Sequence, residues 1–487
     1  MTKKLFEILP LEYVREIIGN AELQISGVEI DSRKCKDGCL FIALKGVESD
    51  GHQYIGKAVL NGAVAVICSE LPSDPDDRIV YVLINDGKEL AGKIADQFYD
   101  CPSAGIKLVG VTGTNGKTTV STLLFQLFTS LGYKCGLIST VENRIGFDVL
   151  PATHTTPDVI SLHQLIFQMK QSGCSHVFME VSSHAADQRR IAGLHFAGAV
   201  FTNITHDHLD YHLTMDAYIK AKKSFFDHLS KDSFAVINLD DKRGTVMVQN
   251  TIARKISYAL QIMADVKGKI LENNISGMHL QINGDDAYFK LIGEFNAYNL
   301  LAVYAAAVQL GVPNWEVLTV LSGLQGAEGR FEQVIQPLTK ICGIVDYAHT
   351  PDALENVIKT ILKIKAHKNQ LITVVGCGGD RDKTKRPEMA RIAAVYSDKV
   401  VLTSDNPRTE NPEDILDDME RGIPESKVSQ VVRITDRSIA IKTAVMLAKP
   451  GDVILVAGKG HEKYQEINGE KFPFDDKMLL EKLLKNP

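Results

Sequence analysis

Long apolar runs, clustered cysteines and an excess of basic residues are all missing from this sequence of 487 residues. A membrane-spanning helix needs roughly 20 consecutive apolar residues, and no stretch of the chain approaches that length. A signal peptide is also missing, because Glu7 and Pro10 interrupt the short apolar run at the N-terminus. We therefore expect a cytoplasmic protein without a membrane partner.

The charge and the cysteines exclude two further classes of protein. The net charge is −6 at pH 7, so nothing attracts the whole chain to nucleic acid, and we expect a monomer without a nucleic-acid partner. Cys35 and Cys39 form the one close pair among the eight cysteines, and no second pair follows to complete a zinc site. We expect reduced thiols.

The length and the alternation of patterns predict several α/β domains. At 487 residues the chain exceeds the size of one hydrophobic core, which implies two to four domains of roughly 100–200 residues. Apolar runs predict strands at 40–44, 63–68, 79–84, 106–111, 134–139, 176–181, 198–202, 234–238, 342–347, 371–376, 399–403 and 453–457. Helical stretches separate most of them, which favours mostly parallel sheets covered by helices.

Two changes in the sequence pattern divide the chain into three expected domains. Cys101-Pro102-Ser103 precedes a strong new pattern, and a third series of strands begins at residue 342. We expect an N-terminal domain at 1–102, a central domain at 103–332 and a C-terminal Rossmann-like domain at 333–487.

The strongest motif lies between the strand at 106–111 and an amphipathic helix. It reads Gly113-Thr114-Asn115-Gly116-Lys117-Thr118-Thr119. Glycines let backbone amides approach phosphate oxygens, and the N-terminus of the helix adds the positive end of its dipole. Lys117 can reach the β- and γ-phosphates, and Thr118 offers a hydroxyl to Mg²⁺. The glycine spacing is shorter than in the common P-loop, since Val111 stands at the first glycine position.

Two strings rich in metal-ligand residues follow in the same expected domain. Glu180 closes an apolar strand, where its carboxylate can take Mg²⁺ beside the loop. Residues 203–212 read Asn-Ile-Thr-His-Asp-His-Leu-Asp-Tyr-His and include His206. That string alone is compatible with a dinuclear metallohydrolase, but such an enzyme leaves the phosphate-binding loop unexplained.

A helix after these strings carries Lys220, Lys222 and Lys223. A run of lysines is usually a solvated face, but one of them could lie inside the site and react with carbon dioxide. The product is a carbamate, an anionic ligand for Mg²⁺, and burial favours the neutral amine that the reaction needs. Periodicity does not separate Lys222 from Lys223.

Polar strings continue in the second half of the chain. Asn296 and Asn299 can read an adenine or ribose edge. Arg330 and Asp346 lie at the expected junction of the second and third domains, where Arg330 approaches the γ-phosphate only when the domains close. A glycine-rich turn at 376–381 is not a dinucleotide fingerprint, because Arg381 stands at its last glycine position.

Six strings together resemble the Mur ligase family of cell-wall synthesis, in the family's order and over essentially the whole chain. They are G-T-N-G-K-T-T, E-V-S-S-H, H-D-H-L-D-Y-H, F-N-x-x-N, D-Y-A-H and G-K-G-H-E. Within the family, the chain is most similar to the ligases that add the third residue to the UDP-N-acetylmuramoyl peptide. The resemblance implies ATP and Mg²⁺ as cofactors and a three-domain α/β fold.

The resemblance also assigns site residues. It implies that ATP is bound by Gly113, Thr114, Asn115, Gly116, Lys117, Thr118, Thr119, Asn296, Asn299, Arg330 and Asp346. It implies that Mg²⁺ is bound by Thr118, Glu180, His206 and Lys222, the last as a carbamate. An alignment with the family that starts from Tyr218 selects Lys222 over Lys223. Catalysis would rest on Lys117, Glu180, His206 and Lys222. The UDP-linked dipeptide would be bound by Ser32, Thr155, Thr156, Ser182, Gln188 and Arg190.

Members of the family add either meso-diaminopimelate or L-lysine, which differ at the distal end of the side chain. Diaminopimelate carries a carboxylate there, and Arg408 offers a planar fork that suits a carboxylate and repels the ammonium of lysine. The resemblance implies that diaminopimelate is bound by Arg386, Asp405, Asn406, Pro407, Arg408, Gly458 and Glu462. We therefore expect diaminopimelate as the amino-acid substrate.

The implied reaction is amide-bond formation through an acyl phosphate. ATP phosphorylates the D-glutamyl carboxylate of UDP-N-acetylmuramoyl-L-alanyl-D-glutamate, and the amine of diaminopimelate displaces the phosphate. The alternatives are an L-lysine-adding ligase, a ligase like folylpolyglutamate synthetase, and a nucleotide-dependent switch that makes no bond. The N-terminal domain with Asp31-Ser32-Arg33 argues against the folate enzyme.

Overall fold

The computed structural model describes residues 1–46, 49–85, 89–152, 154–205 and 209–485. The chain forms two compact units, one of Met1–Lys267 with Tyr298–Val320 and one of Gly268–Ala297 with Leu321–Pro487. None of the helices in the described ranges has the length and apolar character needed to cross a membrane. The eight cysteines, all within those ranges, are free thiols, and the sulfur atoms of Cys35 and Cys39 lie 3.6 Å apart.

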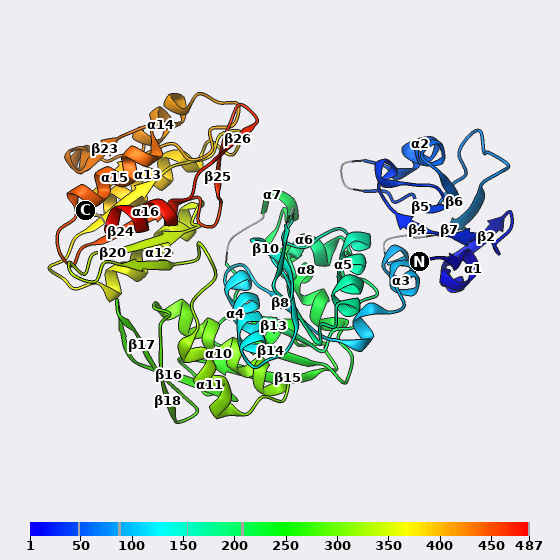
Figure 1. Ribbon diagram of the computed structural model, residues 1–487, viewed down its shortest axis with the longest axis horizontal. Coiled ribbons are helices and arrows are strands. Elements are labelled where there is room, and N and C mark those ends of the chain that lie inside the picture. The colour runs from blue at the N-terminus through cyan, green and yellow to red at the C-terminus, as the bar shows by residue number, and fades with distance from the viewer. Residues whose placement is uncertain (47–48, 86–88, 153, 206–208, 486–487) are drawn as a thin grey trace. The chain divides into compact units, whose positions relative to one another are not determined.

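The first unit begins with a five-stranded sheet (Figure 1). Its order is β2 (Val14–Ile18), β7 (Val80–Ile84), β6 (Ala63–Cys68), β5 (Cys39–Ile42) and β4 (Gly27–Glu29). All neighbours are parallel except β2 and β7. Leu40 and Ile42 point into one core and Phe41 into another, so both faces are buried and the strands read as continuous apolar runs.

Short elements complete this part of the chain. They are β1 (Lys3–Lys4), β3 (Gln24–Ile25), α1 (Leu5–Ile8), α2 (Ile55–Leu60) and α3 (Leu90–Phe98). The predicted strands at 40–44, 63–68 and 79–84 are confirmed within two residues at each end as β5, β6 and β7. The sequence of residues 87–99 also predicts a helix, which corresponds to α3; residues 87 and 88 lie outside the described ranges.

A second sheet in this unit contains the predicted central strands. Its first eight strands run in the order β11 (Asp148–Pro151), β10 (Glu142–Ile145), β9 (Cys135–Ile138), β12 (His176–Glu180), β8 (Lys107–Thr112), β13 (Gly198–Phe201), β14 (Phe234–Asn238) and β15 (Arg254–Ala259). From β9 to β15 the strands are parallel, while β10 and β11 form an antiparallel hairpin at the edge. The pairing of Glu180 with Val111 brings the ends of β12 and β8 to the same edge of the sheet.

The helices between these strands are also as the alternation predicts, and α4 follows β8 directly. They are α4 (Lys117–Ser130), α5 (Val159–Gln171), α6 (Ser183–Asp187), α7 (Leu209–His212), α8 (Met215–Asp227) and α9 (Gly244–Met247). Two more follow later in the chain, α10 (Glu294–Gln309) and α11 (Asn314–Gly323). The side chains of Asp158 and Thr214 accept hydrogen bonds from the first turns of α5 and α8, which sets where each helix begins.

The sequence patterns did not predict the strands between residues 254 and 289. β16 (Val266–Asn274), β17 (Gly277–Ile282) and β18 (Asp285–Phe289) form an antiparallel meander. In β17, the buried Met278, Leu280 and Ile282 alternate with half-buried residues. A sheet with one solvated face has this period of two, which differs from the continuous apolar runs used to find the other strands.

The second unit contains a six-stranded sheet. Its order is β19 (Glu332–Ile335), β20 (Cys342–Asp346), β24 (Val453–Ala457), β21 (Leu371–Val375), β22 (Lys399–Leu402) and β23 (Val431–Arg433). Only β19 is antiparallel to its neighbour among these described strands. The predicted strands at 342–347, 371–376, 399–403 and 453–457 are confirmed within one residue at each end.

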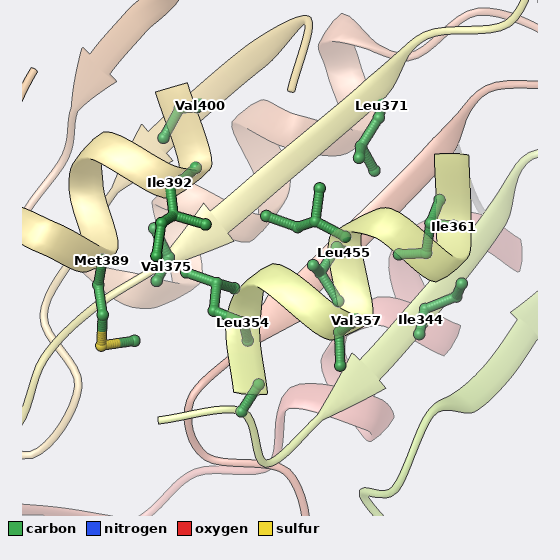
Figure 2. Packing of buried hydrophobic residues seen from close by; sticks show 14 of the residues in the cluster. Ile344, Leu354, Val357, Ile361, Leu371, Val375, Met389, Ile392, Val400 and Leu455 are labelled. Atoms are coloured by element: carbon green, nitrogen blue, oxygen red, sulfur yellow. The ribbon is translucent and has the colours of Figure 1, made fainter. Parts of the chain in front are cut away.

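The core of this unit lies on both faces of the sheet, where helices pack against it. The helices of the unit are α12 (Pro351–Ile364), α13 (Lys385–Tyr396), α14 (Pro412–Glu420), α15 (Arg437–Leu447) and α16 (Asp476–Lys485), and β25 (Tyr464–Ile467) pairs with β26 (Glu470–Pro473). Figure 2 shows Leu354 and Ile361 of α12 packed against Ile344 and Leu455 of the sheet. This packing follows from the apolar stripe of α12 at helical spacing.

One ion pair is buried completely in this unit. Arg437 of α15 donates from Nε and Nη2 to the two carboxylate oxygens of Asp476 in α16, at 2.8 and 2.7 Å. Both side chains are fully buried. The same guanidinium donates to the carbonyl oxygen of Ala457 at 3.1 Å and of Ser404 at 3.5 Å. The pair therefore connects the ends of β22 and β24 to two helices.

We expect Asp476→Ala to lower the free energy of unfolding by about 3–5 kcal/mol, because it leaves the guanidinium of Arg437 buried without a counter-ion. Equilibrium urea unfolding measures the change. The control is Glu481→Ala on the same helix, which removes a partner 3.9 Å from the exposed Lys485 and should cost about 1 kcal/mol or less. Equal losses in the two variants would contradict the prediction.

Candidate active site

The predicted phosphate-binding loop, residues 113–119, connects β8 to α4 and contains two glycines that no other residue can replace. Gly113 has φ +153° and Gly116 has φ +87°. A Cβ atom on Gly113 would lie 1.9 Å from Oγ1 of Thr202, and one on Gly116 would lie 2.6 Å from Oδ1 of Asn299. The loop therefore needs glycine both for its backbone conformation and for the close approach of its neighbours.

Side chains after β13 support the loop from beside it. Thr202 donates from Oγ1 to the carbonyl oxygen of Asn115 at 2.6 Å. Asn203 accepts from the amide of Asn115 at 3.0 Å through Oδ1, and from the amide of Thr114 at 2.8 Å through its carbonyl. These two loop amides face the protein, so the amides of the first turn of α4, beginning at Lys117, are the ones placed to meet a phosphate.

Two lysine side chains converge on one carbonyl of the loop. Lys117 donates from Nζ to the carbonyl oxygens of Gly113 at 2.9 Å and Thr114 at 2.8 Å. Lys222, on α8, donates to the same oxygen of Gly113 at 2.9 Å. Only 1% of the surface of Lys222 is exposed. The structure thus brings together two residues that the sequence placed 105 positions apart.

The geometry separates the two lysines that periodicity left open. Lys223 points away from the loop and forms an ion pair with Asp227 at 2.6 Å, one turn along α8. Lys222 lies with Nζ 4.6 Å from the centre of the Tyr218 ring. The hydroxyl of Tyr218 lies 3.0 Å from Oγ1 of Thr114, so α8 packs on the loop through both residues.

Glu180 ends β12 and is buried beside the loop strand. Its carboxylate accepts hydrogen bonds from the amide of Thr140 at 2.8 Å and from the hydroxyl of Thr140 at 3.2 Å. That hydroxyl lies 3.0 Å from the Oγ1 atom of Thr155. Thr140 was not predicted as a site residue, although it directly follows the predicted strand at 134–139, a position where ligand contacts are common.

The residues predicted for the UDP-linked substrate lie around Glu180. Thr156 donates from Oγ1 to the carbonyl oxygen of Glu180 at 2.8 Å and accepts from the amide of Ser182 at 3.2 Å. Arg190 donates to the carbonyl oxygen of Thr156 at 2.8 Å and to Oε1 of Gln188 at 2.6 Å. One network thus connects Thr155, Thr156, Ser182, Gln188 and Arg190 with Glu180.

Ser32 lies apart from this network, in the N-terminal sheet region. It begins a short 3₁₀ helix whose first turn is capped by the side chain of Asp31. Its side chain is buried, and its carbonyl oxygen accepts from Nδ2 of Asn61 at 2.8 Å. The helix cap from Asp31 and the hydrogen bond from Asn61 therefore fix the backbone at Ser32.

The donor atoms around the loop fit Mg²⁺. Thr118 and Glu180 offer hard oxygen donors at one edge of the sheet, and a carboxylate with two hydrogen bonds retains lone pairs for a metal. No group of three His, Cys, Asp or Glu residues in the described ranges has the arrangement of a metal site. Mg²⁺ usually takes few protein ligands together with phosphate oxygens, which is compatible with this set. His206 lies outside the described residues.

The second unit holds most of the residues predicted for diaminopimelate. The 405–408 loop (Asp405, Asn406, Pro407 and Arg408) follows β22, and Gly458 and Glu462 follow β24. Asn406 donates from Nδ2 to Oε2 of Glu462 at 2.7 Å. Gly458 has φ +117°, and a Cβ atom there would lie 2.5 Å from Oδ2 of Asp405. These predicted residues therefore form one cluster at the carboxyl edge of the sheet.

The conformation of Arg408 is held by the backbone on both sides. It has φ +52°, and its amide donates to the carbonyl oxygen of Glu466 in β25 at 3.0 Å. Nη1 donates to the carbonyl oxygen of Gly379 at 2.7 Å, and Nε lies 3.5 Å from the carboxylate of Glu466. These contacts hold the guanidinium of Arg408 in one position.

Arg386 lies in a different environment from the one predicted. Its side chain is fully buried and donates to the carboxylates of Glu410 at 2.8 Å and Asp418 at 3.0 Å. The neighbouring guanidinium lowers the pKa of Glu410 to about 2. A substrate carboxylate would have to replace Glu410 before Arg386 could bind it. The sequence motif could not reveal these two partners, because both come from later in the chain.

Two of the predicted nucleotide contacts lie together in the second unit. The guanidinium of Arg330 lies 4.8 Å from the centre of the Tyr347 ring. The carboxylate of Asp346 accepts from the amide of Phe331 at 2.7 Å. Loss of water around Asp346 raises its pKa to about 6, against the opposing effect of Arg330.

The two predicted asparagines belong to different units of the chain. Asn299 lies beside Gly116 of the phosphate-binding loop, as described above. Asn296 donates from Nδ2 to the carbonyl oxygen of Ile292 at 2.9 Å in the second unit.

Comparison with known proteins agrees with the order of the motifs. Three family models match the chain: the Mur ligase family catalytic domain at residues 24–99, the Mur ligase middle domain at 111–307 and the Mur ligase glutamate ligase domain at 329–460. A UDP-N-acetylmuramoyl-L-alanyl-D-glutamate–2,6-diaminopimelate ligase from Cytophaga hutchinsonii is 57% identical over 471 residues, which cover 96% of both chains.

The chain belongs to the Mur ligase family. A solved structure of a UDP-N-acetylmuramoyl-L-alanyl-D-glutamate–2,6-diaminopimelate ligase matches this Mur ligase with a TM-score of 0.73 and 34% identity, covering 99% of each chain. A Mur ligase from Thermotoga maritima, solved in complex with ADP, shares the fold with a TM-score of 0.61 and 18% identity, over 94% of this chain and 97% of that one.

These similarities confirm the three-domain α/β architecture of a Mur ligase. Members of the family are ATP-dependent, ADP-forming ligases. The hypotheses of a nucleotide switch and of a metallohydrolase are therefore wrong for this Mur ligase.

We expect Gly116→Ala to weaken ATP binding by about tenfold or more. The new methyl group meets Oδ1 of Asn299 at 2.6 Å, and moving the loop or Asn299 away disturbs the amides at the start of α4. Isothermal titration with a non-hydrolysable ATP analogue measures the change.

The matched control is Gly132→Ala, at the end of α4. Gly132 has φ +89°, so the backbone cost of about 1–2 kcal/mol is the same, but nothing lies within 4 Å of the added Cβ. The control should lose stability and keep its affinity for ATP. Equal affinities in both variants and the wild type would show that the loop does not bind the phosphates.

Proposed function

We propose that this Mur ligase joins meso-diaminopimelate to the D-glutamate of UDP-N-acetylmuramoyl-L-alanyl-D-glutamate, using ATP, in peptidoglycan precursor synthesis. The 405–408 loop carries the proposal. The guanidinium of Arg408 suits the distal carboxylate of diaminopimelate. The carboxylate of Glu462, which accepts a hydrogen bond from Asn406 of the 405–408 loop, suits the distal ammonium. The relative from Cytophaga hutchinsonii, named as a diaminopimelate ligase, supports the same amino acid.

The reaction runs in two steps. The γ-phosphoryl group of ATP passes to the free carboxylate of the D-glutamyl end, which gives an acyl phosphate and ADP. The amine of diaminopimelate then attacks the acyl carbon, and inorganic phosphate leaves from the tetrahedral intermediate. Both steps concentrate negative charge, so amides and cations in fixed positions are the main source of catalysis.

Lys117 and the start of α4 supply those fixed positive groups. The ammonium of Lys117 is held by two carbonyl oxygens of its own loop, at 2.8 and 2.9 Å, so it is ready beside the helix N-terminus before a nucleotide binds. A phosphate attracts an ammonium more strongly than a carbonyl does. We therefore expect the ammonium of Lys117 to leave the two carbonyl oxygens and bind the β- and γ-phosphates when a nucleotide is present.

Mg²⁺, when bound, offsets the charge of the triphosphate and of the approaching carboxylate. We assign its ligands to Thr118, Glu180, His206 and a carbamate on Lys222. The ammonium of Lys222 first loses a proton to give the neutral amine, and Nζ then bonds to the carbon of CO₂ with loss of a second proton. The loss of the two protons replaces a positive charge with a negative one. The burial of Lys222 against the loop supports this assignment.

The UDP-linked dipeptide is assigned to Ser32 and to the network around Glu180. Arg190 is the cation of that network, and its guanidinium can offer donors to an anionic group of the substrate. Asn296, Asn299, Arg330 and Asp346 are assigned to the nucleotide. Arg386 is assigned to diaminopimelate only through displacement of Glu410.

We further propose domain bounds of 1–102, 103–332 and 333–487, which the family matches at 24–99, 111–307 and 329–460 support. The enzyme works in the cytoplasm, where ATP and the UDP-linked precursor are made. We expect a monomer that binds neither nucleic acid nor membrane.

The first test offers the enzyme UDP-N-acetylmuramoyl-L-alanyl-D-glutamate, ATP and either meso-diaminopimelate or L-lysine, with ADP release as the readout. We expect release with diaminopimelate and at least tenfold lower kcat/KM with lysine, because Arg408 pairs with a carboxylate and repels an ammonium. Faster turnover with lysine would contradict the specificity, and no ADP release with any amino acid would contradict the ligase itself.

Arg408→Lys serves as the matched variant in the same assay. It keeps the positive charge and removes the planar fork, so kcat/KM for diaminopimelate should fall by about tenfold or more. The KM for ATP should stay the same.

The second test concerns Lys222. We expect Lys222→Ala to lose at least about a hundredfold in kcat, which corresponds to roughly 3 kcal/mol of transition-state stabilisation. Lys222→Arg should not restore activity, because a guanidinium cannot form the carbamate. A short carboxylic acid added to Lys222→Ala should restore part of it.

Lys223→Ala is the control, since Lys223 faces Asp227 on the same helix and away from the loop. Its activity should remain within about twofold of the wild type. An active Lys222→Ala enzyme would show that no carbamate on this lysine is needed.

A further inference from the structure

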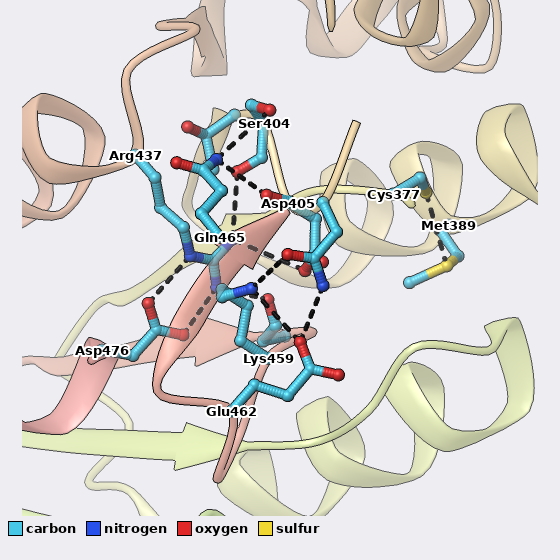
Figure 3. A network of polar contacts seen from close by, with 12 residues as sticks. Cys377, Met389, Ser404, Asp405, Arg437, Lys459, Glu462, Gln465 and Asp476 are labelled. Carbon is cyan, nitrogen blue, oxygen red and sulfur yellow. Dashed lines mark hydrogen bonds and ion pairs between the residues drawn. The ribbon is translucent and has the colours of Figure 1, made fainter. Parts of the chain in front are cut away.

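Lys459 is a fully buried lysine at the centre of the proposed diaminopimelate site (Figure 3). It follows β24 and stands between Gly458 and Gly460, in the G-K-G-H-E string, where the family resemblance assigns roles to Gly458 and Glu462 only. A buried ammonium is strongly unfavourable unless anions and acceptors surround it. The groups that compensate Lys459 therefore indicate what it does.

Two of the proposed ligand-binding residues are those groups. Nζ of Lys459 donates to Oδ1 of Asn406 at 2.8 Å and to Oε2 of Glu462 at 3.2 Å. Asn406 in turn donates from Nδ2 to the same oxygen of Glu462 at 2.7 Å. Lys459, Asn406 and Glu462 thus form a closed triangle of polar contacts.

The triangle determines the orientation of both binding groups. Oδ1 of Asn406 accepts from Lys459 and also from the amide of Glu466 at 2.9 Å, which turns Nδ2 towards Glu462. Oε2 of Glu462 accepts from both Lys459 and Asn406, so Oε1 is the oxygen placed to meet an ammonium of the ligand. Without Lys459, neither the amide nor the carboxylate would be held in this way.

The neighbouring cations have other partners, so Lys459 is the counter-ion of Glu462. Arg437 pairs with Asp476 and lies 3.8 Å from Asp405. Arg408 lies 3.5 Å from Glu466. Among the described residues of this cluster, Asp476 and Asp405 thus share Arg437, Glu466 lies beside Arg408, and Glu462 has Lys459 at 3.2 Å.

We propose that Lys459 is a positioning residue for the distal amino group of diaminopimelate. Its ammonium holds Asn406 and Glu462 in the orientation that binds the ligand, and it stays behind them without touching the reacting atoms. This inference rests on the proposed function and deepens it, because it names the residue that keeps the distal end of the site in order.

The test compares Lys459→Met with the wild type in the full-length enzyme. The KM for diaminopimelate should rise by about tenfold or more, because loss of a charged hydrogen-bond partner releases Glu462. The KM values for ATP and for the UDP-linked dipeptide should stay within about twofold, and kcat within about threefold, since the reacting atoms are not contacted. A parallel rise in all three KM values would show a purely structural role and overturn the inference.

The matched control is Lys463→Met, four residues further along. Lys463 is mostly exposed and pairs with Glu328 at 3.0 Å, outside the triangle. Its KM for diaminopimelate should equal that of the wild type. An equal rise in both variants would attribute the effect to the loop in general, and the inference would fail.

A double variant tests whether Lys459 acts through Glu462. Glu462→Gln alone should raise the KM for diaminopimelate. Adding Lys459→Met should raise it by clearly less than the product of the two single effects, because both changes disturb the same ligand contact. Multiplication of the two effects would mean that the residues act independently, contrary to the proposal.

Two measurements keep the test decisive if Lys459→Met folds poorly. The shift in unfolding temperature caused by ADP shows whether the rest of the enzyme is intact, and it should equal the shift of the wild type. If that shift is lost, Lys459→Gln replaces the variant, because it keeps a polar N–H donor at this buried position, on a side chain one bond shorter, and removes the charge. Lys459→Gln should also raise the KM for diaminopimelate, and an unchanged KM would overturn the inference.

The wild-type assay separates a failure of this inference from a failure of the proposed function. If the wild type uses L-lysine instead of diaminopimelate, the same KM comparisons are made with L-lysine, whose distal ammonium also suits Glu462. A KM unaffected by Lys459→Met, for whichever amino acid the wild type accepts, would overturn the inference alone.

Discussion

The parallel pairing of β8 with β12 and β13 is the constraint on which the phosphate-binding half of the enzyme depends. Parallel strands end at the same edge of a sheet, so the loop after β8, the carboxylate of Glu180 and the hydroxyl of Thr202 all emerge together. The close approach at Gly113 and Gly116 follows from this arrangement, because the neighbouring side chains leave no room for a Cβ atom. A phosphate, a metal ion and a carboxylate can then meet beside one helix N-terminus.

The second unit uses the same edge of a parallel sheet for a different purpose. Its loops follow β21, β22 and β24, and they carry many charged side chains into a region with little water. Such charges are tolerated when each has a partner, as Arg437 has Asp476 and Lys459 has Glu462. The proposed diaminopimelate site thus consists of ion pairs, and these would offer complementary groups in fixed positions to a ligand that carries both an ammonium and a carboxylate.

The agreement between sequence and structure is best where burial is complete. Strands covered on both faces read as continuous apolar runs, and they were predicted within two residues at each end. The strands of the antiparallel meander from β16 to β18 were missed, because one solvated face gives them an alternating pattern. The environment of Arg386 could not be predicted from its local sequence either. Its motif suggested a ligand contact, whereas Glu410 and Asp418, distant in the sequence, bind its guanidinium.

The sequence by itself determined the chemistry of this protein, since short strings of residues identify a phosphate-binding loop, a nearby carboxylate and a family of ligases. Such strings are local, and their residues lie close together whatever the rest of the chain does. Periodicity left Lys222 and Lys223 open, and the tertiary structure shows that Lys222 lies against the loop while Lys223 pairs with Asp227. The contacts of Lys459, on which its proposed role rests, are likewise visible only in the tertiary structure. The physical reason is the same for both lysines. A buried ammonium is defined by its partners, and two of them, Gly113 for Lys222 and Asn406 for Lys459, lie 109 and 53 residues away in the sequence.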